Sequence, residues 1–174
     1  MSVLLFIGIF GVLLVLLFKN PIINTLGENS KMAHKLQTAN WYQNHWLAGI
    51  FLFGMNAVLF FATLCVFYLL ILLMIPFIHI LVMVFAVFGS IFLWIIVNKA
   101  WQGTKRNRLK LGAIGSSFYL ILTFLFVGWF VTLEPSYPGE DTFMKAIGLL
   151  FAIIVTSVAC ITCFVFTGLS KRKV

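Results

Sequence analysis

Charged side chains are scarce in this 174-residue chain: they make up 9% of the residues, whereas hydrophobic residues make up 63%. A soluble domain carries about 25% charged and about 45–50% apolar residues. So few charged residues cannot cover an apolar core of this size, which excludes a soluble globular fold. Because the apolar residues form long runs, we predict an all-α, polytopic membrane protein. The length allows one helical bundle, so we expect a single membrane-embedded domain over residues 1–174.

Cysteine is also scarce, and the three cysteines all lie inside apolar runs. An odd number of cysteines in such positions does not form a disulfide framework. Cys160 and Cys163 have CxxC spacing, but redox thiols are exposed and lie close to positive charge or a helix N-terminus. We therefore predict that both thiols are inert packing groups.

Sequence motifs for catalysis are absent, including glycine-rich phosphate loops, nucleophile elbows and metalloprotease helices. The histidines lie outside the centres of the apolar runs, where facing imidazoles would hold haem. The acidic residues of one loop are scattered, so they would bind a divalent cation weakly. These candidates are His34, His45, His79, Glu134, Glu140 and Asp141. We predict no catalytic residue, no metal site and no cofactor.

Five apolar segments are long enough to cross a bilayer. Residues 47–97 contain no Lys, Arg, Asp or Glu. As one helix they would be roughly 77 Å long, more than twice the hydrocarbon thickness of about 30 Å. They must therefore cross twice, with a break near Pro76, because proline suits the first turn of a helix. The predicted spans cover residues 3–18, 47–73, 77–97, 112–133 and 144–168.

Basic residues set the predicted orientation. Nearly all of them flank the spans at one membrane face, in segments 19–46 and 98–111 and at the C-terminus, and Lys145 is the exception. The positive-inside rule then places the N-terminus outside and the C-terminus inside. It also explains the net charge of +8 without nucleic acid. The main topology-determining residues are Lys99, Lys105, Arg106, Arg108, Lys110, Lys171, Arg172 and Lys173.

Residues 31–46 form a polar segment with apolar residues at helical spacing, from Met32 to Trp46. This pattern predicts an amphipathic helix in the membrane interface, and a partner-docking helix is the alternative. Aromatic rings with a polar edge favour the headgroup level. We predict this interfacial anchoring role for Trp41, Tyr42, Trp46 and Trp101.

The fifth span carries small residues every four positions: Gly148, Ala152, Thr156 and Cys160. This spacing places them on one face, where another helix can approach closely. The approaching helix is either another span of the same chain or a partner subunit.

The sequence has patterns for helix packing but no group of residues that could carry out catalysis. We therefore predict a non-catalytic subunit of the cell membrane. We expect it to bind, stabilise or regulate another integral membrane protein, or a second copy of itself, within the lipid bilayer. An alternative is a small oligomeric transporter or channel with a pathway lined by groups such as Asn56, Thr63 and Ser116. A third hypothesis is a membrane redox or lipid-modifying enzyme.

Overall fold

The computed structural model describes residues 10–12, 31–74, 78–135 and 142–169. These residues form helices and connecting turns, and they contain no β-strand. The elements are α3 (Lys31–Gln37), the short 3-10 helix η1 (Asn40–Gln43), α4 (His45–Leu72), α5 (Ile78–Ala100), α6 (Lys105–Val131) and α7 (Phe143–Gly168).

Four helices, α4 to α7, are long and apolar enough to cross a membrane. They correspond to the second to fifth predicted spans, so the prediction of an all-α chain is confirmed for the described residues, and the length and apolar composition of the four helices suggest a membrane protein. The predicted first span, residues 3–18, lies outside the described residues except for residues 10–12, which are helical.

The predicted break near Pro76 is confirmed by the ends of two helices. Helix α4 ends at Leu72 and α5 begins at Ile78. Met74 in the connection has a φ of 51°, a left-handed conformation that bulky residues rarely adopt. The chain therefore reverses direction within a few residues, as the length of the apolar segment requires.

The predicted spans end at residue 97 and begin again at residue 112, so they leave the basic segment 98–111 as a loop, and the connection in the structure is much shorter. Helix α5 continues to Ala100 and α6 begins at Lys105, so most of the basic side chains project from helices. Thr104 starts α6, because its hydroxyl accepts a hydrogen bond from the backbone N–H of Asn107 at 3.4 Å. Lysine and arginine are good helix formers, and their long side chains extend toward water from a helix end. Charge therefore marks the end of the apolar segment here and not the end of the helix.

The predicted continuous helix over residues 31–46 is also wrong in its extent. It is divided into α3, η1 and the first turn of α4. The Thr38 hydroxyl donates to the backbone oxygens of His34 and Lys35, which closes the end of α3. The Asn44 side chain accepts from the backbone N–H of Trp46 at 3.1 Å and begins α4. These local side-chain bonds compete with a continuous helix.

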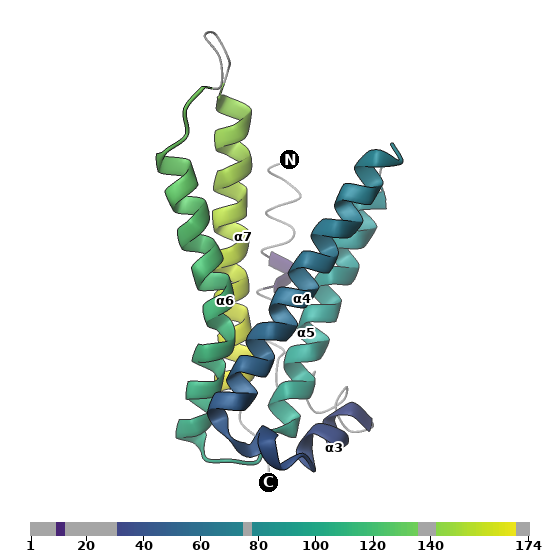
Figure 1. Cartoon of the computed structure of the whole chain (residues 1–174), viewed down its shortest axis with the longest axis vertical. Helices are drawn as coiled ribbons and strands as arrows, with labels where there is room; N and C mark the ends of the chain where they lie inside the picture. Colours follow the sequence, from purple (N-terminus) through teal and green to yellow (C-terminus); the bar gives the residue numbers. More distant parts are fainter. Residues whose placement is uncertain (1–9, 13–30, 75–77, 136–141, 170–174) are drawn as a thin grey trace.

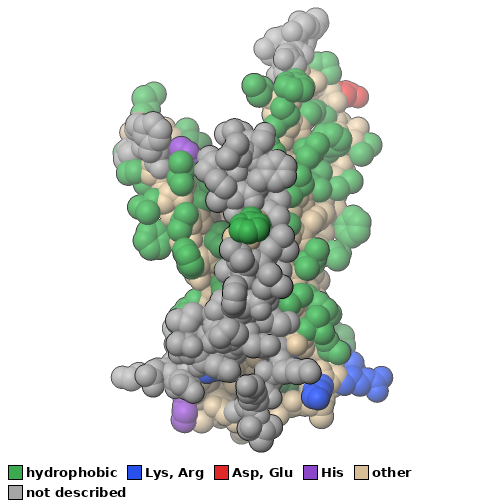
Figure 2. Space-filling view, turned by 180° about the vertical axis from the view of Figure 1, so that it is seen from behind, with side chains coloured by type: hydrophobic (Ala, Val, Ile, Leu, Met, Phe, Trp, Pro, Cys, Tyr) green, Lys and Arg blue, Asp and Glu red, His purple; other side chains and the backbone are tan. Residues whose placement is uncertain are grey.

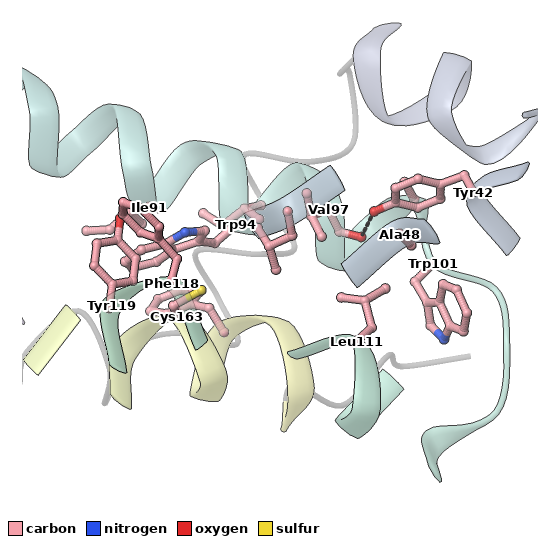
Figure 3. Packing of buried hydrophobic residues seen from close by; sticks show 14 residues of the cluster. Tyr42, Ala48, Ile91, Trp94, Val97, Trp101, Leu111, Phe118, Tyr119 and Cys163 are labelled. Atoms are coloured by element: carbon pink, nitrogen blue, oxygen red, sulfur yellow. Dashed lines mark hydrogen bonds between the residues drawn. The ribbon is translucent and has the colours of Figure 1, made fainter. Parts of the chain in front are cut away.

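The four long helices form two pairs, α4 with α5 and α6 with α7 (Figure 1). The pairs lie close together at the end that carries α3, and they diverge toward the opposite end. We call these the closed end, which holds the start of α4 and the end of α5, and the open end, which holds Met74 and Glu134. The buried hydrophobic cluster is made by residues of the closed end and of the adjoining middle turns (Figure 3).

Candidate functional site: a polar junction of four helices

Asn56 lies where all four long helices meet, and it is only 1% exposed. Its side-chain nitrogen donates to the backbone oxygen of Gly115 on α6 at 3.0 Å and to Sγ of Cys163 on α7 at 3.6 Å. Its side-chain oxygen accepts from Nε1–H of Trp94 on α5 at 2.9 Å. One amide therefore cross-links α4 to three other helices.

Glycines allow the close approach that these bonds require. A Cβ added to Gly115 would overlap the side chain of Leu52, which is fully buried. On the facing helix, a Cβ added to Gly49 would lie 2.8 Å from Cβ of Ile114. Each glycine thus accepts a branched side chain from its neighbour, and α4 and α6 pack with their backbones close together.

Aromatic rings surround the junction. Trp94 packs edge-to-face on Tyr119, with ring centroids 6.2 Å apart, and it also contacts Phe166. Figure 3 shows Trp94, Tyr119 and Cys163 lying together between the helices. The surrounding rings hold the indole of Trp94 in position to donate to Asn56.

A second polar contact ties α5 to the end of α7. The Asn98 side-chain nitrogen donates to the backbone oxygens of Phe166 at 2.6 Å and Thr167 at 3.4 Å. The last carbonyl groups of a helix have no partner within that helix. Asn98 therefore acts as a side-chain cap for α7 and fixes its position against α5.

Tyr42 makes the corresponding contact for η1. Its hydroxyl donates to the backbone oxygen of Val97 at 2.9 Å (Figure 3), and its side chain is fully buried. Burial raises the pKa of this hydroxyl, because the phenolate would lose its hydration. Tyr42 thus attaches the segment before α4 to the end of α5 as a neutral hydrogen-bond donor.

The predicted aromatic anchors fall into two groups. Trp41 and Trp46 are exposed, so anchoring at the headgroup level remains a prediction for them. Tyr42 and Trp101 are instead buried inside the protein, with their ring centroids 6.5 Å apart. Their rings form the contact between η1 and the end of α5, and anchoring at the headgroup level remains a prediction for these two residues as well.

The small-residue face of α7 is divided in a similar way. The hydroxyl groups of Thr156 and Thr123 lie 2.9 Å apart, and Sγ of Cys160 donates to the backbone oxygen of Ser116 at 3.5 Å. This half packs on α6 of the same chain. Gly148 is exposed instead, and none of the residues that the structure describes has an atom within 4 Å of the position that a Cβ would take. The part of the stripe toward the open end therefore packs on none of the described helices.

The described histidines and acidic residues considered as haem or metal ligands do not lie together. His45 begins α4 and His79 lies in the first turn of α5, at opposite ends of this helix pair. Glu134 is exposed at the open end, and Glu140 and Asp141 lie outside the described residues, as do Lys171, Arg172 and Lys173. Among the described residues, no group of three His, Cys, Asp or Glu side chains could hold a metal ion. The cysteines in the described helices are free thiols.

The polar residues of the transport hypothesis serve helix packing. The Asn56 side chain bonds to other helices, whereas the hydroxyls of Thr63 and Ser116 donate to carbonyl oxygens of their own helices. Asn56 lies in the packed core, whereas Thr63 and Ser116 each bond within one helix. The geometry therefore favours a structural role for them over a shared polar pathway.

Sequence reasoning identified Asn56 as a polar group in a span but could not name its partners. It missed Trp94, which looks like one more apolar residue in its run, and Asn98, which it assigned to a loop. The sequence signal that could have indicated these contacts is an amide side chain on an apolar helix. Such a group needs a hydrogen-bond partner away from water.

Comparisons of the chain with protein-family models, with curated proteins and with solved structures gave no match.

Proposed function

We propose that this protein is a non-catalytic membrane subunit that binds a transmembrane helix of another membrane protein at its open end. The observation that supports this proposal is the change along α4 and α6. The faces that pack together at the closed end continue toward the open end without a partner from the other helix pair.

The helical repeat identifies this continuation on α6. Gly115 and Phe118 face α4, and residues three or four positions further along the same face are Leu122, Leu125 and Trp129. Leu122 is partly buried against the core, whereas Leu125 and Trp129 are 62% and 63% exposed. The packing face therefore extends beyond the packed region.

The unoccupied half of the small-residue stripe supports the same proposal. Gly148 lies toward the open end of α7, and none of the described side chains or backbone atoms fills the space beside it. Small residues allow the backbones of two membrane helices to approach closely, and the gain comes from van der Waals contact. A partner helix beside Gly148 and the exposed rings of α6 would bury surface that otherwise faces lipid.

The proposed orientation follows from charge. The basic residues of α5 and α6 lie at the closed end, and Glu134 lies at the open end (Figure 2). We propose that the closed end faces the cytoplasm and that residues 3–18 supply a fifth span, with the N-terminus outside. In this arrangement, the protein resides in the cell membrane and meets its partner in the outer half of the bilayer.

Affinity purification of the full chain in a mild detergent, followed by mass spectrometry, tests this proposal. We expect a membrane protein to co-purify with the wild type, and we expect Gly148→Ile to reduce its recovery about tenfold, because close packing is lost. Gly89→Ile is the matched control, because a Cβ at Gly89 also meets no atom of the described part of the chain within 4 Å. Purification as a lone monomer, or equal losses in the two variants, would contradict the proposal.

A further inference from the structure

An apolar groove of about 390 Å³ lies at the closed end, between the α3–η1 segment and the α4–α5 pair. Met55 of α4 and Leu93 and Ile96 of α5 are among its lining residues. Lys35 and Trp41 also line it, and both are exposed, so they form its rim. The volume falls within the range of about 300–1,000 Å³ that is typical of small-molecule sites.

The walls of this groove are held in place by neighbouring contacts. Trp41 packs edge-to-face on Phe51 and on Tyr42, with ring centroids 5.5 Å and 5.7 Å apart. Tyr42 is bonded in turn to the backbone of α5 at Val97. The rim residue Trp41 is therefore attached to both helices that form the floor, and the groove is a preformed feature of the closed end.

The electrostatic environment of the groove favours an anion. Lys35 is the charged residue in its lining, and residues 31–46 contain no Asp or Glu. Glu134, the acidic residue that the structure describes, lies at the opposite end. The basic residues at the start of α6 add positive potential at the closed end, which can attract anionic headgroups within a Debye length of about 8 Å at physiological salt.

We propose that this groove binds an anionic phospholipid, with one acyl chain along the apolar walls and the phosphate against the Lys35 ammonium. Its walls include residues of α4 and α5, the two helices that we propose lie in the membrane. A lipid could therefore enter the groove without leaving the bilayer. An indole at the rim suits the depth where a lipid changes from acyl chain to headgroup. The site goes beyond the proposed partner function and requires only that α4 and α5 span a membrane.

A phospholipid explains the combination of features better than a partner peptide does. A peptide strand or helix carries backbone polar groups that need hydrogen-bond partners. The named floor residues offer only apolar side chains to an occupant. The hydrocarbon tail of a phospholipid has no polar atoms, and the charged phosphate of the same lipid would lie at the rim, where Lys35 is.

Native mass spectrometry of the full chain tests the site, with phosphatidylglycerol and phosphatidylcholine of identical acyl chains as probes. We expect the wild type to retain phosphatidylglycerol preferentially. Lys35→Gln should weaken this retention about fivefold and weaken phosphatidylcholine retention less, because the choline group of that lipid already balances the charge of its phosphate. Lys105→Gln is the matched control, since it removes a basic residue of the same end that does not line the groove.

A second variant tests the acyl-chain position. Ala39 also lines the groove, so Ala39→Phe should fill it and reduce retention of both lipids. A thermal unfolding curve shows whether this variant is folded; if it is not, Lys35→Gln decides alone, because Lys35 is exposed and its replacement leaves the core intact.

Three results would overturn the proposal. The first is equal losses in Lys35→Gln and Lys105→Gln, which would indicate general attraction to the basic end. The second is equal retention of the two lipids by the wild type. The third is a dimer or a bound protein that a folded Ala39→Phe variant releases while phosphatidylglycerol retention is unchanged, because the groove would then be a protein interface.

Discussion

The closed and open ends of this protein use similar apolar helices for different purposes. At the closed end, Asn56, Asn98 and Tyr42 each bond to another element, and the side chains around them are buried. At the open end, large residues such as Leu125 and Trp129 are exposed. This difference indicates that hydrophobicity makes the helices suited to a membrane, whereas small residues and amides decide where the helices pack on each other.

The largest expected difference between the ends comes from a matched pair of leucines. Leu52→Ala should lower the free energy of unfolding by about 2 kcal/mol or more, because Leu52 is fully buried and its loss leaves a cavity. Leu125→Ala should change it by less than about 0.5 kcal/mol, because an exposed site creates no cavity. Reversible unfolding in detergent micelles measures both. Similar losses in the two variants would show that the open end is packed as well.

A pair of glycines on α6 sharpens the same comparison. Gly115→Ala should destabilise by about 2 kcal/mol, because the new methyl group overlaps the buried Leu52 side chain. Gly128 lies toward the open end, where a Cβ would meet no atom within 4 Å among residues 10–12, 31–74, 78–135 and 142–169. Gly128→Ala should therefore be neutral or stabilising by up to about 1 kcal/mol, since alanine favours the helix. Thermal denaturation of the two variants gives the result. A tolerated Gly115→Ala would contradict the close α4–α6 approach.

The polar junction should have a somewhat smaller effect. Asn56→Leu removes the bonds to Trp94, Gly115 and Cys163 and should cost about 1–2 kcal/mol, because buried donors and acceptors lose their partner. Thr63→Val is the control, because the Thr63 hydroxyl donates to the backbone oxygen of Leu59 in its own helix. Unfolding in the same detergent compares them. Loss of solute flux in proteoliposomes with unchanged stability in Asn56→Leu would instead support the transport hypothesis.

The smallest expected effect depends on pH. Tyr42→Phe should cost about 1 kcal/mol at neutral pH, because the bond to Val97 is lost. Burial raises the Tyr42 pKa in the folded protein, so its contribution is complete below the ordinary pKa of about 10 and declines as the pH rises above it. The wild type should therefore lose stability above about pH 10 more steeply than Tyr42→Phe does. Parallel pH profiles of the two proteins would show that the hydroxyl is not buried.

The sequence predicted four of the spans well because each is a long apolar run between charged or proline-containing segments. It predicted the last residue of α3 and the first residue of α6 poorly. The α6 boundary was misplaced because Lys105 and Arg106 were read as loop residues, although the Thr104 cap allows them to begin the helix. The segment before α4 was misread because Thr38 and Asn44 close and open helices through local side-chain bonds.

The sequence predicted some residues of the candidate site but not the contacts between them. Asn56 and the stripe from Gly148 to Cys160 stand out in the sequence, because amides and small residues are unusual features of apolar helices. Their partners could not be named, since hydropathy and spacing describe one helix at a time. The division of the stripe, with Thr156 and Cys160 used by α6 and Gly148 left open, depends on how α6 and α7 lie against each other.

The sequence by itself determined that this chain forms helices long and apolar enough to cross a membrane, because its uncharged runs are as long as a bilayer is thick. The tertiary structure alone decided that Asn56 joins four helices, that Tyr42 and Trp101 are buried, and that α3, η1 and the α4–α5 pair enclose a groove. The physical reason is that insertion depends on the summed hydropathy of each segment, whereas packing depends on which side chains meet across segments far apart in the chain.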